Sequence, residues 1–369
     1  MAEELRALIL NAGSSTLKWA VVDARAGTTV ASGTEGWTGG RGDQIAARLA
    51  AAPAFAAVGH RVVHGGAEFR AAVRVDAGVR ARLDALVELD PLHMPPALAG
   101  IDAVAAAFPD VPQIAAFDTA FHATLPAAAA GYALPHEWTS AWGLRRFGFH
   151  GLSVAHAVGR AAALAGRMPP RLIVCHLGGG CSITAVADGR SIDTTMGLTP
   201  LEGVVMATRS GSVDPGLLLH LILRRGVAPA DLQTALDERS GLLGVSGVSG
   251  DLRQVLAAAD AGDARAGLAY GEFVWSLRRA IGAMAGVLGG ADAVVFTGGI
   301  GENSARARAD VAAALPHLWL DEAANAAAIP DCDVAAGGSL VRAFVVRARE
   351  DLVILAEIAR VLGWGAVTG

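Results

Sequence analysis

One strand, turn and strand plan occurs twice in this sequence, 165 residues apart. The first copy spans residues 5–22, with a turn of small residues at 11–15. The second copy spans residues 172–187, with three glycines at 178–180 as its turn. Apolar segments joined by a tight glycine turn are typical of a β-hairpin. We therefore expect two domains that share one hairpin plan.

Strands and helices alternate in both halves of the chain. A third apolar strand at 293–297 leads into Gly298-Gly299 and a helical stretch. Apolar periodicity predicts further helices at 80–89, 153–165, 263–288 and 351–362. This alternation favours the α/β class, and 369 residues are enough for about two domains.

Composition excludes several classes of function. The formal net charge is −5 and basic residues form no block, which argues against a nucleic-acid or anionic-membrane binder. We find neither an uninterrupted apolar stretch of about 20 residues nor a secretory signal. The three cysteines, Cys175, Cys181 and Cys332, lack metal-ligand spacing and fit a reducing compartment. We expect a soluble, cytoplasmic protein.

Lysine and asparagine are very rare here, so their positions are informative. The only lysine is Lys18, and the three asparagines are Asn11, Asn303 and Asn325. Two of these four residues fall in the eight-residue segment 11–18, together with glycine and hydroxyl side chains. Such a turn can hold phosphate through backbone N–H groups, although no helix follows it as in a Walker A loop. The alternative is an ordinary Gly/Ser hairpin.

Eight motifs in order along the chain resemble the acetate kinase family. They lie at residues 11–18, 60–66, 117–122, 145–151, 196–203, 208–215, 240–249 and 296–303. The resemblance implies two related actin-like ATPase (ribonuclease H-like) domains that flank a nucleotide cleft. It assigns residues 1–122 and 352–369 to the first domain, which the C-terminal helix closes. Residues 123–351 form the second domain, with the adenosine site and a homodimer interface.

The resemblance also implies the reaction. The γ-phosphoryl group of ATP passes directly, in line, to acetate, giving acetyl phosphate and ADP reversibly. Mg²⁺, or Mn²⁺ in its place, is the expected metal, and neither nucleic acid nor membrane is an expected partner. A kinase for propionate or another short carboxylate, a different phosphoryl donor such as pyrophosphate, and a non-catalytic nucleotide-binding module are the alternatives.

Four residues match the family's catalytic positions: Arg61, Asp118, His150 and Arg209. Charge spreads over the phosphoryl oxygens in the transition state, and a guanidinium can pair with those oxygens. The acetate site matches Arg61, Val63, Leu92, His93, Phe149 and Pro200. One methylene in such a small apolar pocket is worth only about 1–3 kcal/mol, so we expect the pocket to accept propionate as well.

The resemblance assigns nucleotide and metal contacts as well. The nucleotide positions are Asn11, Ser14, Thr16, Lys18, His176, Leu177, Gly178, Gly179, Gly180, Asp251, Leu252, Arg253, Gly299, Ile300, Gly301, Glu302 and Asn303. Magnesium prefers oxygen ligands, and the resemblance assigns the metal to Asn11 and Glu350, with Asp118 as the other matching carboxylate and Asp351 as an alternative to Glu350. Gly179 stands where the family usually has asparagine, so one side-chain amide near the phosphates is missing.

Overall fold

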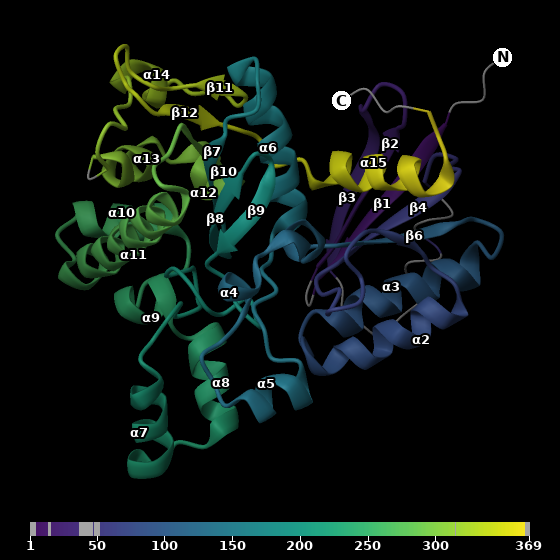
Figure 1. The fold of residues 1–369 in the computed structure, drawn as a ribbon, viewed down its shortest axis with the longest axis horizontal. Helices are drawn as coiled ribbons and strands as arrows, with labels where there is room; N and C mark the ends of the chain where they lie inside the picture. Colours follow the sequence, from purple (N-terminus) through teal and green to yellow (C-terminus); the bar gives the residue numbers. More distant parts are fainter. Residues whose placement is uncertain (1–4, 14–15, 37–46, 48–51, 314, 366–369) are drawn as a thin grey trace. The chain divides into compact units, whose positions relative to one another are not determined.

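The computed structural model describes residues 5–13, 16–36, 47, 52–313 and 315–365, which fall into two compact units (Figure 1). Unit 1 comprises residues 1–123, 149–156 and 349–369, and unit 2 comprises residues 124–148 and 157–348. The chain therefore passes between the units four times. The sequence-based domain boundaries remain a prediction.

Unit 1 is built on a six-stranded mixed sheet. Its strands are β1 (Arg6–Ala12), β2 (Thr16–Asp23), β3 (Thr29–Gly36), β4 (Ala57–Val62), β5 (Val73–Arg74) and β6 (Gln113–Phe117). Their order in the sheet is β3-β2-β1-β4-β6-β5. The central strands β1, β4 and β6 are parallel, while β2, β3 and β5 run antiparallel to their neighbours. The carboxyl ends of the three parallel strands consequently meet at one edge.

Helices cover both faces of this sheet. They are α2 (Ala77–Ala85), η1 (Leu86–Glu88), α3 (Met94–Ala107), η2 (Ala120–Thr124) and α15 (Glu350–Leu362). Side chains of β1 alternate, so Leu8 packs with Val104 of α3, whereas Ile9 packs with Ile358 of α15. Figure 1 shows α15 on one face and α2 and α3 on the other. A Cβ on Gly59 would lie 2.4 Å from Ile354, so glycine allows α15 to approach β4 closely.

Unit 2 repeats the sheet of unit 1. Its strands are β7 (Arg171–Leu177), β8 (Cys181–Ala187), β9 (Arg190–Thr194), β10 (Ala293–Thr297), β11 (Cys332–Asp333) and β12 (Arg342–Val345). The order β11-β12-β10-β7-β8-β9 matches that of unit 1 read from the other end. Strand β7 coincides with β1 shifted by 165 residues, which confirms the duplicated hairpin. The expected turn at 11–15 was too long, because β1 continues through Asn11 and Ala12.

The remaining helices belong mainly to unit 2. They are α4 (Ala127–Ala130), α5 (His136–Trp142), α6 (Gly151–Ala165), α7 (Pro215–Arg225), α8 (Pro229–Glu238), α9 (Gly241–Ser246), α10 (Leu252–Asp260), α11 (Ala264–Leu288), α12 (Gly298–Asn303), α13 (Ala305–Ala312) and α14 (Glu322–Ala326). The long helix α11 packs on β7, β8 and β9. The predicted third strand and the four predicted helices are confirmed to within a few residues. In the described part of the chain, no helix has both the length and the apolar character needed to cross a membrane.

Candidate active site

Arg61 is the centre of a cluster at the carboxyl edge of the unit 1 sheet. It lies near the end of β4, Asp118 directly follows β6, Asn11 is near the end of β1, and Glu350 begins α15. Arg61 donates to both oxygens of Asp118, from Nε at 3.1 Å and from Nη2 at 2.5 Å. Its Nη1 donates to Asn11 Oδ1 at 3.2 Å, and its Nε lies 3.3 Å from Glu350 Oε2. Four residues that are distant in sequence therefore converge.

Burial governs the charges in this cluster. Asp118 is 1% exposed, and burial, aided by the negative charge of Glu350, raises its pKa to about 6 although Arg61 opposes the shift. Burial disfavours the charge on Arg61, but Asp118 and Glu350 outweigh it and raise the pKa of the guanidinium above its usual value. The side chain of Arg61 keeps a fifth of its surface exposed, so it can still meet a ligand.

The oxygen atoms around Arg61 suit a hard divalent cation. Asn11, Asp118 and Glu350 offer amide and carboxylate oxygens, the ligand type that Mg²⁺ prefers. Within the described ranges, no three His, Cys, Asp or Glu side chains gather closely enough to hold a metal by themselves. A magnesium ion here would therefore need oxygens from a ligand or water, as is usual for this ion. Asp351, by contrast, pairs with Arg349 at 2.8 Å.

His150 has an unusual backbone beside Asp118. Its φ is +59°, a left-handed conformation that few non-glycine residues adopt. The next residue, Gly151, donates its N–H to the Asp118 carbonyl at 2.8 Å, and a Cβ there would lie only 2.1 Å from that oxygen. The start of α6 is thus pressed against the backbone of Asp118. Such conformations persist where the surroundings hold them, often at functional sites.

The other predicted acetate contacts of unit 1 differ in exposure. Phe149 is buried and packs edge-on against His64, with ring centroids 5.5 Å apart. Val63 directly follows β4 and is partly buried, whereas Leu92 is exposed. His93 Nδ1 lies 2.8 Å from Asp90 Oδ1, and its charged form would lower the pKa of Asp118. Val63 follows the strand that carries Arg61, and Phe149 directly precedes His150 beside Asp118. A charged His93 would act on Asp118 itself, so these three residues lie near the Arg61 cluster.

The first hairpin places Asn11 and Lys18 opposite each other. They are paired residues of β1 and β2, and Lys18 is exposed. Thr16 is also exposed, and its carbonyl accepts the Gly13 N–H at 2.8 Å. Ser14, another predicted nucleotide contact, lies outside the described residues. The hairpin therefore brings the rare asparagine and the only lysine to one end of the sheet.

In unit 2 the second and third glycine passages meet. A Cβ on Gly178 would lie 4.0 Å from the Gly299 nitrogen. Gly298 has a φ of +78°, and a Cβ there would lie 2.7 Å from the Leu177 carbonyl oxygen, so only glycine fits. His176 stands opposite Ser182 at the end of β7, and its Nε2 would lie 3.7 Å from a Cβ on Gly178. The ends of β7 and β10 thus form one glycine-lined surface.

The other predicted nucleotide contacts border this surface. Ala207 donates its N–H to the Gly179 carbonyl at 3.2 Å, and a Cβ on Gly250 would lie 3.1 Å from the Ala207 oxygen. Gly250 precedes Asp251, which caps α10 by accepting the Arg253 N–H. Ala207 thereby connects the glycine turn to the start of α10, where Leu252 is buried.

Helix α12 carries the last group of predicted nucleotide residues. Asn303 Nδ2 donates to the Gly299 carbonyl at 2.9 Å. The Glu302 carboxylate accepts the Ala348 N–H at 2.9 Å, so its side chain is engaged by the protein backbone. Gly301 is buried, whereas a Cβ on Gly299 would meet nothing within 4 Å. Gly299 is therefore the glycine of this helix beside open space.

Arg209 lies on a loop of unit 2 with Pro200. Its Nη1 donates to the Pro200 carbonyl at 3.3 Å, and no carboxylate pairs with it among the described residues. Its charge lowers the pKa of Cys181, although burial raises that pKa more strongly. Arg209 is thus near the start of β8 and keeps hydrogen-bonding capacity for a ligand.

Sequence reasoning missed the residues that hold this loop. Arg146 Nη1 donates to the carbonyls of Thr194, Thr195 and Met196, and its Nη2 donates to Glu202 at 2.7 Å. Tyr132 also donates to Glu202, at 2.7 Å, and burial together with that carboxylate raises the pKa of Tyr132 to about 12. Tyr132 is one of only two tyrosines, and that rarity was the available signal.

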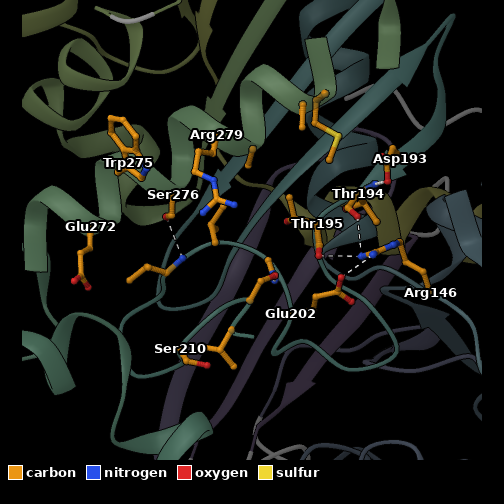
Figure 2. Close-up of a pocket in the computed structure, with 18 residues that line it drawn as sticks. Arg146, Asp193, Thr194, Thr195, Glu202, Ser210, Glu272, Trp275, Ser276 and Arg279 are labelled. Atoms are coloured by element: carbon orange, nitrogen blue, oxygen red, sulfur yellow. Dashed lines mark hydrogen bonds and ion pairs between the residues drawn. The ribbon is translucent and has the colours of Figure 1, made fainter. Parts of the chain in front are cut away.

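A cavity of about 750 Å³ is lined in part by the loop that carries Pro200 and Arg209 (Figure 2). Arg146, Thr194 and Glu202 line one side, and Trp275 and Arg279 of α11 line the other. It contains none of the predicted site residues. The network that holds the loop therefore forms a wall of this cavity, while Pro200 and Arg209 lie outside it.

Comparisons with known proteins agree on one family. Residues 43–356 match the acetokinase family. An acetate kinase of Gloeobacter violaceus is 51% identical over 81% of this chain and 75% of its own length. An acetate kinase of Deinococcus radiodurans is 43% identical over 96% of this chain and 98% of its own length.

Solved structures give the same result. Porphyromonas gingivalis acetate kinase has a TM-score of 0.91 at 32% identity, covering 97% of this chain and 100% of that one. A propionate kinase of Francisella tularensis has a TM-score of 0.89 at 34% identity, covering 96% and 98%. The α/β fold and the family resemblance expected from the sequence are both confirmed.

Proposed function

The chain belongs to the acetokinase family and is an enzyme, a kinase; we propose that it transfers the γ-phosphoryl group of ATP to acetate. The products are acetyl phosphate and ADP, and the reaction is reversible. The observation that carries this proposal is the convergence of Asn11, Asp118 and Glu350 on Arg61 at one edge of the sheet. Ligands of open α/β sheets bind at the carboxyl ends of the strands.

The unit 1 residues suit the carboxylate and the metal. Arg61 would pair with the acetate carboxylate through its planar guanidinium, with Phe149 and Val63 beside the methyl group. Asn11, Asp118 and Glu350 would hold Mg²⁺ through bound water and phosphate oxygens. When bound, the metal would neutralise phosphate charge. The pairing of Asp351 with Arg349 supports Glu350 as the metal carboxylate.

Phosphoryl transfer requires charge stabilisation more than a covalent nucleophile. An acetate oxygen forms a bond to the γ-phosphorus as the bond from phosphorus to the ADP oxygen breaks. Arg209 and His150 would donate hydrogen bonds to the phosphoryl oxygens as charge develops on them. The glycine turn 178–180 and Gly299 would leave room for phosphate and adenosine, as the open space beside Gly179 and Gly299 supports. Backbone donors would then replace the amide that Gly179 lacks.

Propionate is the second candidate substrate. It is favoured by the structural similarity to the Francisella tularensis propionate kinase and by the small cost of one methylene in an apolar pocket. We also propose a cytoplasmic homodimer. Exposed apolar side chains on α7 and α11, Leu219, Leu223 and Trp275, support an interface in unit 2.

The proposal is tested by trapping the acyl phosphate with hydroxylamine. Purified protein with Mg²⁺ receives ATP or pyrophosphate as donor and acetate, propionate or butyrate as acceptor. We expect the fastest hydroxamate formation with ATP and acetate, and none without the carboxylate. A folded protein that binds ADP but forms no hydroxamate with any pair would contradict the proposal and favour a non-catalytic nucleotide-binding module.

A further inference from the structure

Arg308 is a buried cation that no carboxylate neutralises within the described residues. It lies in α13 and is 2% exposed. Its Nη1 donates to the carbonyls of Gly301 and Glu302, at 2.8 and 2.9 Å. Its Nε donates to Asn325 Oδ1 and its Nη2 to the Asn325 carbonyl, both at 2.7 Å. Burial lowers the pKa of Arg308.

The two carbonyls that Arg308 binds belong to the last residues of α12. The final carbonyls of a helix have no partner within that helix and carry partial negative charge. A guanidinium satisfies them with directed hydrogen bonds, which an apolar side chain could not do. Burying a cation without a carboxylate is costly, and the hydrogen bonds to these carbonyls offset that cost only while α12 keeps this position. The arrangement therefore indicates a need to hold α12 in one position.

Asn325 completes the arrangement from α14. It is 4% exposed, and its Nδ2 donates to the Ala305 carbonyl at 2.9 Å while its Oδ1 accepts from Arg308. Both ends of the amide are used, and leucine or alanine could make neither of these hydrogen bonds. This accounts for one of only three asparagines in the chain.

Helix α12 is consequently fixed at both ends. Its start is set by Gly298, packed on the Leu177 carbonyl, and its end is set by Arg308. Between these points lie Gly299, which the proposed function places beside phosphate and adenosine, and Ile300, which the family resemblance assigns to the nucleotide. We propose that Arg308 and Asn325 are positioning residues that hold Gly299 and Ile300 in the geometry that binds the nucleotide. This inference rests on the proposed function.

The test separates nucleotide affinity from general stability. ADP binding is measured by calorimetry in Arg308→Met and in the double variant Arg308→Met/Asn325→Leu, which also removes the Asn325 oxygen that Arg308→Met leaves without a donor. We expect the Kd for ADP to rise about tenfold or more, because displacement of Gly299 and Ile300 by about 1 Å would have effects of this size. The KM for acetate should stay within about twofold, and kcat should largely recover at saturating ATP.

Arg278→Met is the matched control. Arg278 of α11 donates to the Asp310 carbonyl of α13, from Nε at 3.0 Å, and to no residue of α12. The Arg278→Met variant should lower the thermal unfolding midpoint without weakening ADP binding. Arg308→Lys, which keeps the charge but not the guanidinium fork, should fall between wild type and Arg308→Met.

Each outcome decides the matter. Unchanged ADP affinity in folded Arg308→Met or in the double variant would overturn the inference, as would equal weakening in Arg278→Met. If wild-type protein forms hydroxamate and binds ADP, such a result leaves the proposed function standing. If wild-type protein binds no ADP, the proposed function fails and this inference fails with it.

Discussion

The two predicted catalytic arginines have opposite surroundings. Arg61 is enclosed by Asp118, Glu350 and Asn11, whereas Arg209 donates a hydrogen bond to a carbonyl, that of Pro200. A guanidinium already paired with carboxylates is held in place and has less charge to offer a ligand. Arg209 keeps more of its charge for a phosphoryl group. It should therefore be the more sensitive site for turnover.

Replacement of Arg209 tests this difference. In Arg209→Ala we expect kcat for hydroxamate formation to fall about 10³-fold or more, because an arginine that stabilises the transferring group contributes on this scale. Arg209→Lys should recover only part of the loss, since an ammonium lacks the planar fork. Steady-state kinetics with circular dichroism as a check of folding would measure both.

The control for this experiment is Arg190→Ala. Arg190 is an exposed arginine of β9 in the same unit. It should retain wild-type turnover, which separates a specific role from the loss of any positive charge. Near-normal kcat in Arg209→Ala would remove Arg209 from the catalytic residues.

Sequence reasoning selected Arg61 but could not supply its partners. Motif similarity distinguishes Arg61 from the other arginines, whereas its contacts come from β6, β1 and α15, which only the folded sheet brings together. Motif similarity favoured Glu350 as the metal carboxylate and left the adjacent Asp351 as an alternative. The structure separates them, because Glu350 approaches Arg61 while Asp351 pairs with Arg349.

At the scale of elements, the hairpins were largely predictable. Their apolar runs and glycine turns are local signals. Strand β7, like the third predicted strand β10, begins and ends where expected or within one residue of it. The network of Arg146, Glu202 and Tyr132 was not predictable, because it joins the chain across 70 residues to support an irregular loop. Local periodicity carries no information about such contacts.

Helix α12 allows a sharp comparison of adjacent glycines. Gly298→Ala should lower the free energy of unfolding by about 1–3 kcal/mol, because its φ of +78° and the Leu177 carbonyl exclude a Cβ. Gly299→Ala should leave stability nearly unchanged, since nothing lies within 4 Å of its Cβ position. Its ADP affinity should nevertheless fall if Gly299 contacts the nucleotide.

Urea unfolding and ADP calorimetry measure the two effects separately. Each variant is the control for the other, as they differ by one position in the same helix. Equal stability of Gly298→Ala and wild type would contradict the packing argument. Unchanged ADP affinity in Gly299→Ala would remove Gly299 from the nucleotide site.

At the scale of the whole molecule, buried titratable groups of unit 1 connect stability to pH. Burial lowers the pKa of His60 to about 4, opposed by its contact of 2.7 Å with Gln113. Burial also lowers the pKa of His122 to about 4, opposed by its hydrogen bond to the Phe149 carbonyl at 2.9 Å. Burial shifts the pKa of Asp118 the other way, raising it to about 6. Between pH 4 and 6 the two histidines and Asp118 therefore change the free energy of unfolding in opposite directions.

The sign for a histidine follows from proton binding. As pH falls, the unfolded histidine, with a pKa of about 6.5, binds a proton before the folded one does. The stabilising contribution of the buried neutral histidine is therefore present above pH 6.5 and is lost as pH falls toward 4. From pH 7 to pH 5 the expected loss is about 2 kcal/mol for each histidine. Asp118 offsets part of this, because its raised pKa makes the folded state bind protons more readily than the unfolded state.

The change of unfolding free energy with pH in the wild type is a sum of these opposing contributions, so the difference between variants is the informative quantity. His122→Gln keeps an amide donor for the Phe149 carbonyl but cannot titrate. Relative to wild type, it should lose about 2 kcal/mol less unfolding free energy between pH 7 and pH 5, whatever Asp118 contributes. Urea unfolding at both pH values measures the difference. An identical loss in wild type and His122→Gln would show that His122 is protonated in the folded state as readily as in the unfolded chain.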